Sequence, residues 1–308
     1  MKKLSFIIPC YNEEKVLDIL YKRLNDVSKK INNYDIDFIF INDGSKDKTE
    51  YIIEDFTKKD DRVKLISFSR NFGHQAAVSC GIHNTDSDLA VIIDADLQDP
   101  PEIIPSMIEE YEKTNIPIIY GKRISREGES IFKKITAKIF YRLINLLSDI
   151  KFPVDTGDFR LIDRKVIEVY KQFSENPKYI RGLISWTGFE QKAFEYKREI
   201  RVAGETKYTL KKMLKFAVTG ILSFSTKPLK ISLYLGITFI FISIINFLYL
   251  FIQKDLTRIL HYIIISIFFI GGTQLISLYV ISEYIGNLFN EVKKRPEYII
   301  KSIFKTNL

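Results

Sequence analysis

The chain has 308 residues, of which 46% are apolar, enough for one large domain or two with a buried core. Its formal net charge of +8 is moderate and indicates an anionic partner, either nucleic acid, anionic lipid or an anionic substrate, without choosing among them. The two cysteines, Cys10 and Cys80, show no metal-binding or redox spacing, so we expect them to be reduced packing residues. They imply no disulfide framework.

Up to about residue 200, short apolar runs alternate with polar, helix-like stretches. The apolar runs are LSFIIP, IDFIFIN, VKLISFS, LAVIID and IPIIYG, and the stretches between them are residues 13–31, 46–58, 75–83 and 101–113. The first run is too short for a signal peptide and is broken by Pro9, so we expect a β-strand there. This alternation predicts an α/β fold with a Rossmann-like, mostly parallel, doubly wound sheet.

Two long uncharged runs follow, at residues 231–252 and 259–282. The first has 22 residues and as a helix would extend about 33 Å, enough for the hydrocarbon core of a bilayer. Two buried helices of a soluble domain are the alternative, but soluble helices carry a polar stripe and these runs do not. The linker between the two runs, QKDLTR, is too short to be a domain, so the pattern predicts a transmembrane hairpin.

Basic residues flank the two runs on their outer sides. They are Lys207, Lys211, Lys212, Lys215, Lys227 and Lys230 before the hairpin, and Lys293, Lys294, Arg295, Lys301 and Lys305 after it. The linker carries only Lys254 and Arg258. This excess predicts a multi-pass protein of the inner (cytoplasmic) membrane, with both termini and the N-terminal domain cytoplasmic.

The segment KYTLKKMLKFAVTGILSFS places apolar residues on one helical face beside lysines. These residues are Leu210, Met213, Leu214, Ala217, Ile221 and Phe224. The pattern indicates an interfacial helix on the inner leaflet, with a core-packing helix as the alternative. We therefore expect four regions: a catalytic domain at 1–205, juxtamembrane amphipathic helices at 206–230, two transmembrane helices within 231–282, and a cytoplasmic tail at 283–308.

The run LAVII ends in a cluster of carboxylates, DADLQDPPE. Asp94 and Asp96 are two residues apart on what we expect to be extended chain, so their side chains point to one side. Paired carboxylates suit Mg²⁺ or Mn²⁺ when diphosphate oxygens complete the metal shell. A lone D-x-D is a weak signal, and Asp99 before Pro100 and Pro101 looks like a helix N-cap.

Several further motifs accompany this cluster in order along the chain: IIPCYNEE, NDGSKDKT, RNFGHQAAV, DTGDFRLIDRKV, RGLISWTGF, AGETKYTLKKMLKF and EYIGNLFNEVKKRPEYII. Together they resemble the GT-A fold, family 2 glycosyltransferases that act on polyprenyl phosphate. This group includes bacterial bactoprenol glucosyl transferases and dolichyl-phosphate mannose synthases. The resemblance extends from residue 5 to about residue 300, and it identifies the family better than the sugar.

The resemblance implies roles for individual residues. The nucleotide-binding residues would be Pro9, Tyr11, Glu13 and Asp43, and the metal ligands Asp94, Asp96 and Gln98. Phosphate of the donor or acceptor would be bound by Arg123, Arg126, Arg160 and Arg181. The catalytic carboxylates would be Asp155 and Asp158, together with Asp96, and the sequence does not choose between the first two. His74 also matches a motif position, and a role in packing or hydrogen bonding is at least as strong an expectation for it as a role in the reaction.

The implied reaction is inverting transfer of a sugar from a nucleotide-sugar donor to a polyprenyl phosphate such as undecaprenyl phosphate. UDP-glucose is the first choice of donor, and N-acetylhexosamine, mannose and aminoarabinose donors stay open. The partners would be the donor, the lipid acceptor and the membrane, with no nucleic acid, and a homo-oligomer stays open. The rivals are a processive polysaccharide synthase, which would carry more spans and a QxxRW motif where this chain has RGLISW, and a scaffold with a degenerate transferase domain.

Overall fold

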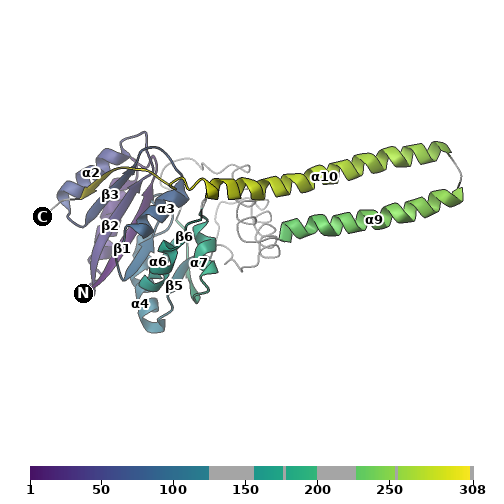
Figure 1. Cartoon of the computed structure of the whole chain (residues 1–308). Helices are drawn as coiled ribbons and strands as arrows, with labels where there is room; N and C mark the ends of the chain where they lie inside the picture. Colours follow the sequence, from purple (N-terminus) through teal and green to yellow (C-terminus); the bar gives the residue numbers. More distant parts are fainter. Residues whose placement is uncertain (125–155, 176–177, 200–226, 254–255, 306–308) are drawn as a thin grey trace. The chain divides into compact units, whose positions relative to one another are not determined.

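The computed structural model describes residues 1–124, 156–175, 178–199, 227–253 and 256–305 (Figure 1). These residues divide by their contacts into two units. Residues 1–124, 156–175, 178–199 and 296–305 form the first unit, which is built on a β-sheet. Residues 227–253 and 256–295 form the second, which is helical.

The sheet of the first unit has eight strands in the order β7-β5-β6-β4-β1-β2-β3-β8. The strands are β1 (Lys2–Cys10), β2 (Tyr34–Asn42), β3 (Val63–Phe68), β4 (Leu89–Ile92), β5 (Ile118–Arg123), β6 (Thr156–Asp163), β7 (Gln191–Tyr196) and β8 (Ile300–Lys305). Strands β4, β1, β2 and β3 run parallel, as predicted from the alternation of apolar runs and helices. The sheet as a whole is mixed, because β6 and β8 join it antiparallel.

Helices cover both faces of this sheet. On one face lie α1 (Leu17–Ser28), α2 (Thr49–Lys59) and α4 (Ile104–Thr114), the last preceded by the 3₁₀ turn η1 (Pro101–Ile103). On the other face α3 (His74–His83) packs against β1 and β2 and contacts α6 (Arg164–Lys171), which in turn contacts α7 (Ile180–Trp186). Because both faces are covered, the central strands contain continuous apolar runs, such as FIFI in β2 and LAVI in β4.

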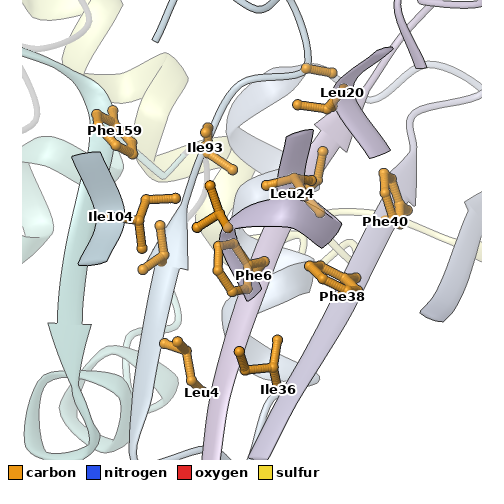
Figure 2. Close-up of a cluster of buried hydrophobic side chains, with 14 of the residues drawn as sticks. Leu4, Phe6, Leu20, Leu24, Ile36, Phe38, Phe40, Ile93, Ile104 and Phe159 are labelled. Carbon is orange, nitrogen blue, oxygen red and sulfur yellow. The ribbon is translucent and has the colours of Figure 1, made fainter. Parts of the chain in front are cut away.

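The central strand β1 sends alternate side chains into the two layers. Leu4, Phe6 and Ile8 join the main core under α1, while Ile7 faces α3. Figure 2 shows Phe6 beside residues of α1, β2 and η1-α4, and its ring centroid lies 5.3 Å from that of Phe38. On the Ile7 face, a Cβ on Gly81 would collide with the Ile7 side chain, so glycine lets α3 approach the sheet closely.

The order of the strands differs from a simple continuation of the βαβ pattern. The fifth predicted strand, β5, does not pair with β4, because β6 lies between them and is antiparallel to both. β6 contains TGDFRL of the DTGDFRL motif, for which site residues were predicted but no strand. This insertion brings Asp158 and Arg160 next to the end of β4.

The C-terminal residues return to the sheet. Within the segment expected to be a tail, β8 pairs antiparallel with β3, with Ile66 opposite Ile303. Tyr298 stacks on Phe68 with ring centroids 5.0 Å apart. The tail therefore completes the edge of the catalytic sheet.

The second unit contains two long helices, α9 (Lys227–Gln253) and α10 (Leu256–Val292), which run side by side (Figure 1). Phe239 and Phe269 pack edge to face between them, with centroids 4.6 Å apart. Among the described residues one stretch, Ser266–Phe289, is long and apolar enough to cross a membrane, with a mean hydropathy of 1.3, and Leu233–Ile242 is a shorter apolar stretch. The two-span hairpin stays a prediction. Of the juxtamembrane region predicted at 206–230, the segment KYTLKKMLKFAVTGILSFS lies outside the described residues, and residues 227–230 belong to α9.

Candidate active site

The carboxyl ends of three neighbouring parallel strands lead into four of the predicted site residues: Tyr11 after β1, Asp43 after β2, and Asp94 and Asp96 after β4. β1 and β2 end level with each other, with Cys10 opposite Asn42, so Tyr11 and Asp43 leave the sheet at the same edge. β4 ends at Ile92, immediately before the DADLQD segment. Ligands of open α/β sheets bind at this edge, because the loops that leave parallel strands converge there.

Asp158 is the most heavily engaged carboxylate of the site. It is 4% exposed, and Arg181 donates two hydrogen bonds to it, from Nε to Oδ1 at 2.7 Å and from Nη2 to Oδ2 at 3.2 Å. His74 Nε2 lies 3.0 Å from Oδ2, and Gln75 Nε2 donates to the same oxygen at 3.4 Å. Burial alone would raise the pKa of Asp158, but the charges and hydrogen bonds of Arg181 and His74 hold it well below its usual range. Asp158 is therefore a fixed anion and a poor proton acceptor.

His74 connects Asp158 to Asp94. Its Nε2 lies 3.5 Å from Asp94 Oδ1, in addition to its contact with Asp158. Burial would lower the pKa of His74, but the two carboxylates raise it to about 9, so the imidazole is a cation at neutral pH. The side chain keeps 41% of its surface exposed, so water weakens both attractions.

The D-x-D pair has features of a cation site. Burial raises the pKa of Asp94 to about 6, against the attraction of His74 and with added repulsion from Asp158 and Asp96. Its buried Oδ1 accepts no hydrogen bond from the described residues. Asp96 accepts a hydrogen bond from the Gln98 backbone at 3.1 Å. The same oxygen lies 3.5 Å from His74 Nε2, an ion-pair contact and not a hydrogen bond. A carboxylate oxygen that accepts no hydrogen bond within the described residues, beside a second carboxylate, fits a divalent cation.

The described residues do not contain a complete protein cage for a metal. No group of three or more His, Cys, Asp or Glu side chains within them has the arrangement of a metal site. Mg²⁺ and Mn²⁺ need only one or two protein carboxylates where substrate phosphates supply the other oxygens. The residues therefore fit a metal that binds together with a nucleoside diphosphate.

Asp43 braces a loop of the site. Its buried carboxylate accepts hydrogen bonds from Phe72 N at 2.7 Å, Gly73 N at 3.0 Å and Asn71 Nδ2 at 2.9 Å. Burial raises the pKa of Asp43, and the two backbone donors oppose that shift. This bracing positions the backbone that leads into α3 and His74.

The other predicted nucleotide-binding residues lie at the end of β1. Pro9 is buried inside the strand, so it shapes the sheet beneath the loop. Tyr11 and Glu13 are half-buried beyond it, and the backbone N–H of Glu13 donates to Thr49 Oγ1 at 2.9 Å. The loop between them turns through Asn12, whose φ is 55°.

Comparison with known proteins identifies the family. The family model described as "Glycosyl transferase family 2" matches residues 5–171, which is more than half of the chain. The chain belongs to glycosyl transferase family 2. It is a glycosyltransferase with a Rossmann-like mixed sheet, as the motifs indicated.

Relatives match this glycosyltransferase over nearly its whole length. The "Uncharacterized glycosyltransferase YkcC" of Bacillus subtilis (strain 168) is 46% identical over 306 residues, 97% of this chain and 94% of that protein. The "SfII prophage-derived bactoprenol glucosyl transferase" of Shigella flexneri is 38% identical over 312 residues, 99% of each chain. Among solved structures, S. aureus TarS 1–349 in complex with UDP-GlcNAc aligns with a TM-score of 0.48 and 14% identity, over 72% of this chain and 66% of that one.

Two arginines expected to bind phosphate differ in what they contact. Arg160 of the glycosyltransferase is 3% exposed, and it donates to the backbone carbonyls of Asp158 at 3.2 Å and Gly157 at 3.0 Å. Its guanidinium is thus buried and holds the backbone of Asp158, and its role in phosphate binding stays a prediction. Arg123 lies beside Gly157, where a Cβ would be 2.6 Å from Arg123 Nη2. Glycine there leaves room for the Arg123 guanidinium next to the site.

Asp99 differs from the predicted N-cap. The residue before the 3₁₀ turn is Pro100, and no side chain caps the turn. Asp99 is fully buried and accepts a hydrogen bond from the Tyr196 hydroxyl, while Arg198 Nε lies 3.4 Å from Oδ1 and Arg123 Nη2 3.7 Å from Oδ2. Asp99 therefore fixes the loop of the D-x-D motif to β5 and β7.

The structure brings together Asp94, Asp96, Asp158 and Arg181, while Asp155 and Arg126 lie outside the described residues. Gln75 and the position of His74 between Asp94 and Asp158 were not predicted from the sequence. The sequence FGHQ carried a signal for both, because a glycine before a helical stretch often ends a loop. Gly73, with φ of 104°, is the N-cap of α3, and His74 and Gln75 are the first two residues of that helix. Tyr196 carried no comparable signal, since an aromatic residue in a strand is ordinarily a core residue.

Proposed function

We propose that this glycosyltransferase transfers glucose from UDP-glucose to a polyprenyl phosphate such as undecaprenyl phosphate. The observation that carries the proposal is the 38% identity to a protein named as a bactoprenol glucosyl transferase over 99% of both chains. That match extends far beyond residues 5–171 and includes the apolar helices α9 and α10. A soluble acceptor would give no reason for these helices.

The acceptor determines the chemistry that the protein has to supply. A phosphate monoester has a second pKa near 6, so at neutral pH it is largely a dianion and needs no general base. One of its oxygens attacks the anomeric carbon while the bond from that carbon to the diphosphate oxygen breaks. The nucleoside diphosphate leaves with the bonding electrons, and in-line attack inverts the anomeric carbon.

Asp158 suits this reaction because it is held as an anion. A residue with so low a pKa is a weak base at neutral pH, which fits an acceptor that arrives already ionised. We propose that Asp158 stabilises the positive charge that develops at the anomeric carbon, and that Arg181 fixes its orientation. Asp155 stays a second candidate for this role.

We propose that Asp94 and Asp96, with Gln98 beside them, hold Mg²⁺ or Mn²⁺ on the donor diphosphate. The metal would neutralise charge on the leaving diphosphate. The buried Oδ1 of Asp94 accepts no hydrogen bond within the described part of the chain, so it would be available to the metal. Tyr11, Glu13, Arg123 and Arg126 are the proposed contacts to the rest of the donor and to phosphate.

The proposed location is the inner membrane. A catalytic domain at 1–205, completed by β8, would lie in the cytoplasm, with amphipathic helices at 206–230 and two spans within 231–282. Reporter fusions at residues 1 and 308 test this arrangement, because both should report the cytoplasm and only the QKDLTR linker should be labelled from outside. A C-terminus outside would mean that one of the two helices does not span.

The donor and acceptor are tested with membranes that contain the protein. Incubation with undecaprenyl phosphate and a panel of UDP- and GDP-sugars should give a lipid-linked product with UDP-glucose in preference to the other donors. Preference for N-acetylhexosamine, mannose or aminoarabinose would change the sugar and keep the lipid acceptor. Extension to a polymer would instead support a processive synthase.

A further inference from the structure

A buried ion pair joins the C-terminal segment to the catalytic unit, apart from the site residues described above. Lys178 Nζ lies 3.5 Å from Glu297 Oε2, and the two side chains keep 6% and 15% of their surface exposed. Ser79 of α3 connects them, because its hydroxyl donates to Glu297 at 2.9 Å and accepts from Lys178 at 3.3 Å. The ammonium also lies 5.1 Å from the centroid of the Tyr170 ring. Three segments far apart in the sequence thus meet at one polar cluster.

The two charges depend on each other. Burial lowers the pKa of Lys178 and raises that of Glu297, and each partner opposes the shift of the other. Removing one member of a buried pair leaves the other charge without compensation, which costs much more than removing both. Such a pair is a poor source of net stability, but it fixes the position of the chains that carry it.

The chain that carries Lys178 leads directly into the Asp158 cluster. Lys178 lies two residues before the first residue of α7, whose Arg181 donates two hydrogen bonds to Asp158. The backbone N–H of Ile180 donates to Gln75 Oε1 at 3.0 Å, and Gln75 also contacts Asp158. The start of α7 is therefore held to α3 on one side by Gln75 and on the other by the Lys178, Ser79 and Glu297 cluster.

We propose that Lys178 and Glu297 are positioning residues of the transferase reaction, which hold the start of α7 so that Arg181 keeps Asp158 in place. This makes the segment that follows α10 a part of the active-site framework. The inference rests on the proposed role of Asp158, and the experiment below separates the two.

The test compares turnover and donor affinity in the full-length protein. Glu297→Gln and Lys178→Met should each lower kcat by about tenfold to a hundredfold, as expected when a catalytic group is misplaced, and leave KM for the donor within about twofold. The milder Ser79→Ala should lower kcat in the same direction, which keeps the test valid if a charge variant fails to fold. Glu50→Gln is the matched control, because Glu50 binds Lys301 of β8 at 3.3 Å in an exposed pair, and its kcat should not change.

The link to Arg181 is tested by combining variants. Arg181→Ala alone should lower kcat, and adding Glu297→Gln to it should cause no further loss, because both act through the same carboxylate. If the losses in kcat from Arg181→Ala and Glu297→Gln multiply in the double variant, the inference is overturned. It is also overturned if the Glu297→Gln and Ser79→Ala proteins have lower melting temperatures but keep wild-type kcat. Full activity of Arg181→Ala would instead refute the proposed role of the Asp158 clamp.

Discussion

Replacing Asp158 by asparagine tests the clamp at the centre of the proposed site. The substitution keeps the shape of the side chain and removes its charge. Arg181 then loses its anionic partner, and the new amide group presents N–H donors to a cluster that already contains four donor atoms, two from Arg181 and one each from His74 and Gln75. We expect catalysis to suffer more than donor binding, because Asp158 is proposed to act on charge that develops in the transition state.

The size of the effect follows from the hydrogen bonds that are lost. Each hydrogen bond to a charged group contributes about 1.5–3 kcal/mol, and the amide oxygen of asparagine can retain one of the two from Arg181. Loss of the other and of the bond from His74 amounts to about 3–6 kcal/mol. At about 1.4 kcal/mol for each factor of ten, kcat should fall by about 10²–10⁴-fold.

The assay measures release of nucleoside diphosphate by purified protein with a prenyl phosphate acceptor, with donor KM determined in parallel. Asp86→Asn is the matched control, because the Asp86 side chain is 91% exposed and forms a surface pair with Lys171. The control should retain wild-type kcat. A folded Asp158→Asn protein that keeps more than a tenth of wild-type kcat would refute the reasoning.

Three further predictions concern the metal pair, a turn and an acidic group. Asp96→Asn should remove most activity, a loss of several kcal/mol of transition-state stabilisation. The fold should be retained, because asparagine can still accept the hydrogen bond from Gln98 N. Full turnover of this variant, or of the wild type in excess chelator, would contradict the metal assignment. Gly44→Ala should lower the free energy of unfolding by at least about 2 kcal/mol, because Gly44 has φ of 63° and a Cβ there would lie 2.6 Å from Asn71 N. Gly188→Ala, with φ of 73° and open space around the glycine, should lower it by only about 1 kcal/mol. Equal melting temperatures of the two variants would contradict this account. Burial would raise the pKa of Asp60, but hydrogen bonds from Arg62 and Tyr21 lower it from 3.8 to about 2, so its stabilisation is complete above about pH 4 and is lost as the pH falls toward 2. The difference in melting temperature between wild type and Asp60→Asn should therefore shrink over that range, and a difference that grows on acidification would show that the sign is wrong.

The parallel centre of the fold was predictable because its sequence pattern is local. The apolar runs that became β1 to β4 alternate with amphipathic helices, and in α1 the buried Leu17, Leu20, Leu24 and Val27 recur at helical spacing. The positions of β6 and β8 were not predictable in this way. Each reaches its partner strand through a long intervening segment, and nothing local in TGDFRLID or IKSIFK specifies the neighbouring strand.

The same distinction applies to the site. Asp43, Asp94 and Asp96 could be placed at one edge because they follow predicted parallel strands. The contact between Asp158 and His74 depends on β6 lying next to β4, so it could not be derived before that pairing was known. Arg160 was predicted to bind phosphate from its motif alone, and only the structure shows that its guanidinium is buried against the backbone carbonyls of Gly157 and Asp158.

The structure of the lipid-linked product tests the central claim most directly. Purified protein, UDP-glucose and undecaprenyl phosphate should yield undecaprenyl phosphate carrying a single glucose, identified by mass spectrometry. NMR should show the glucose attached to the phosphate oxygen through an anomeric carbon inverted relative to the donor. Glucose joined to a hydroxyl group or to a growing glycan, or a retained anomeric configuration, would contradict the assignment of this glycosyltransferase to polyprenyl phosphate.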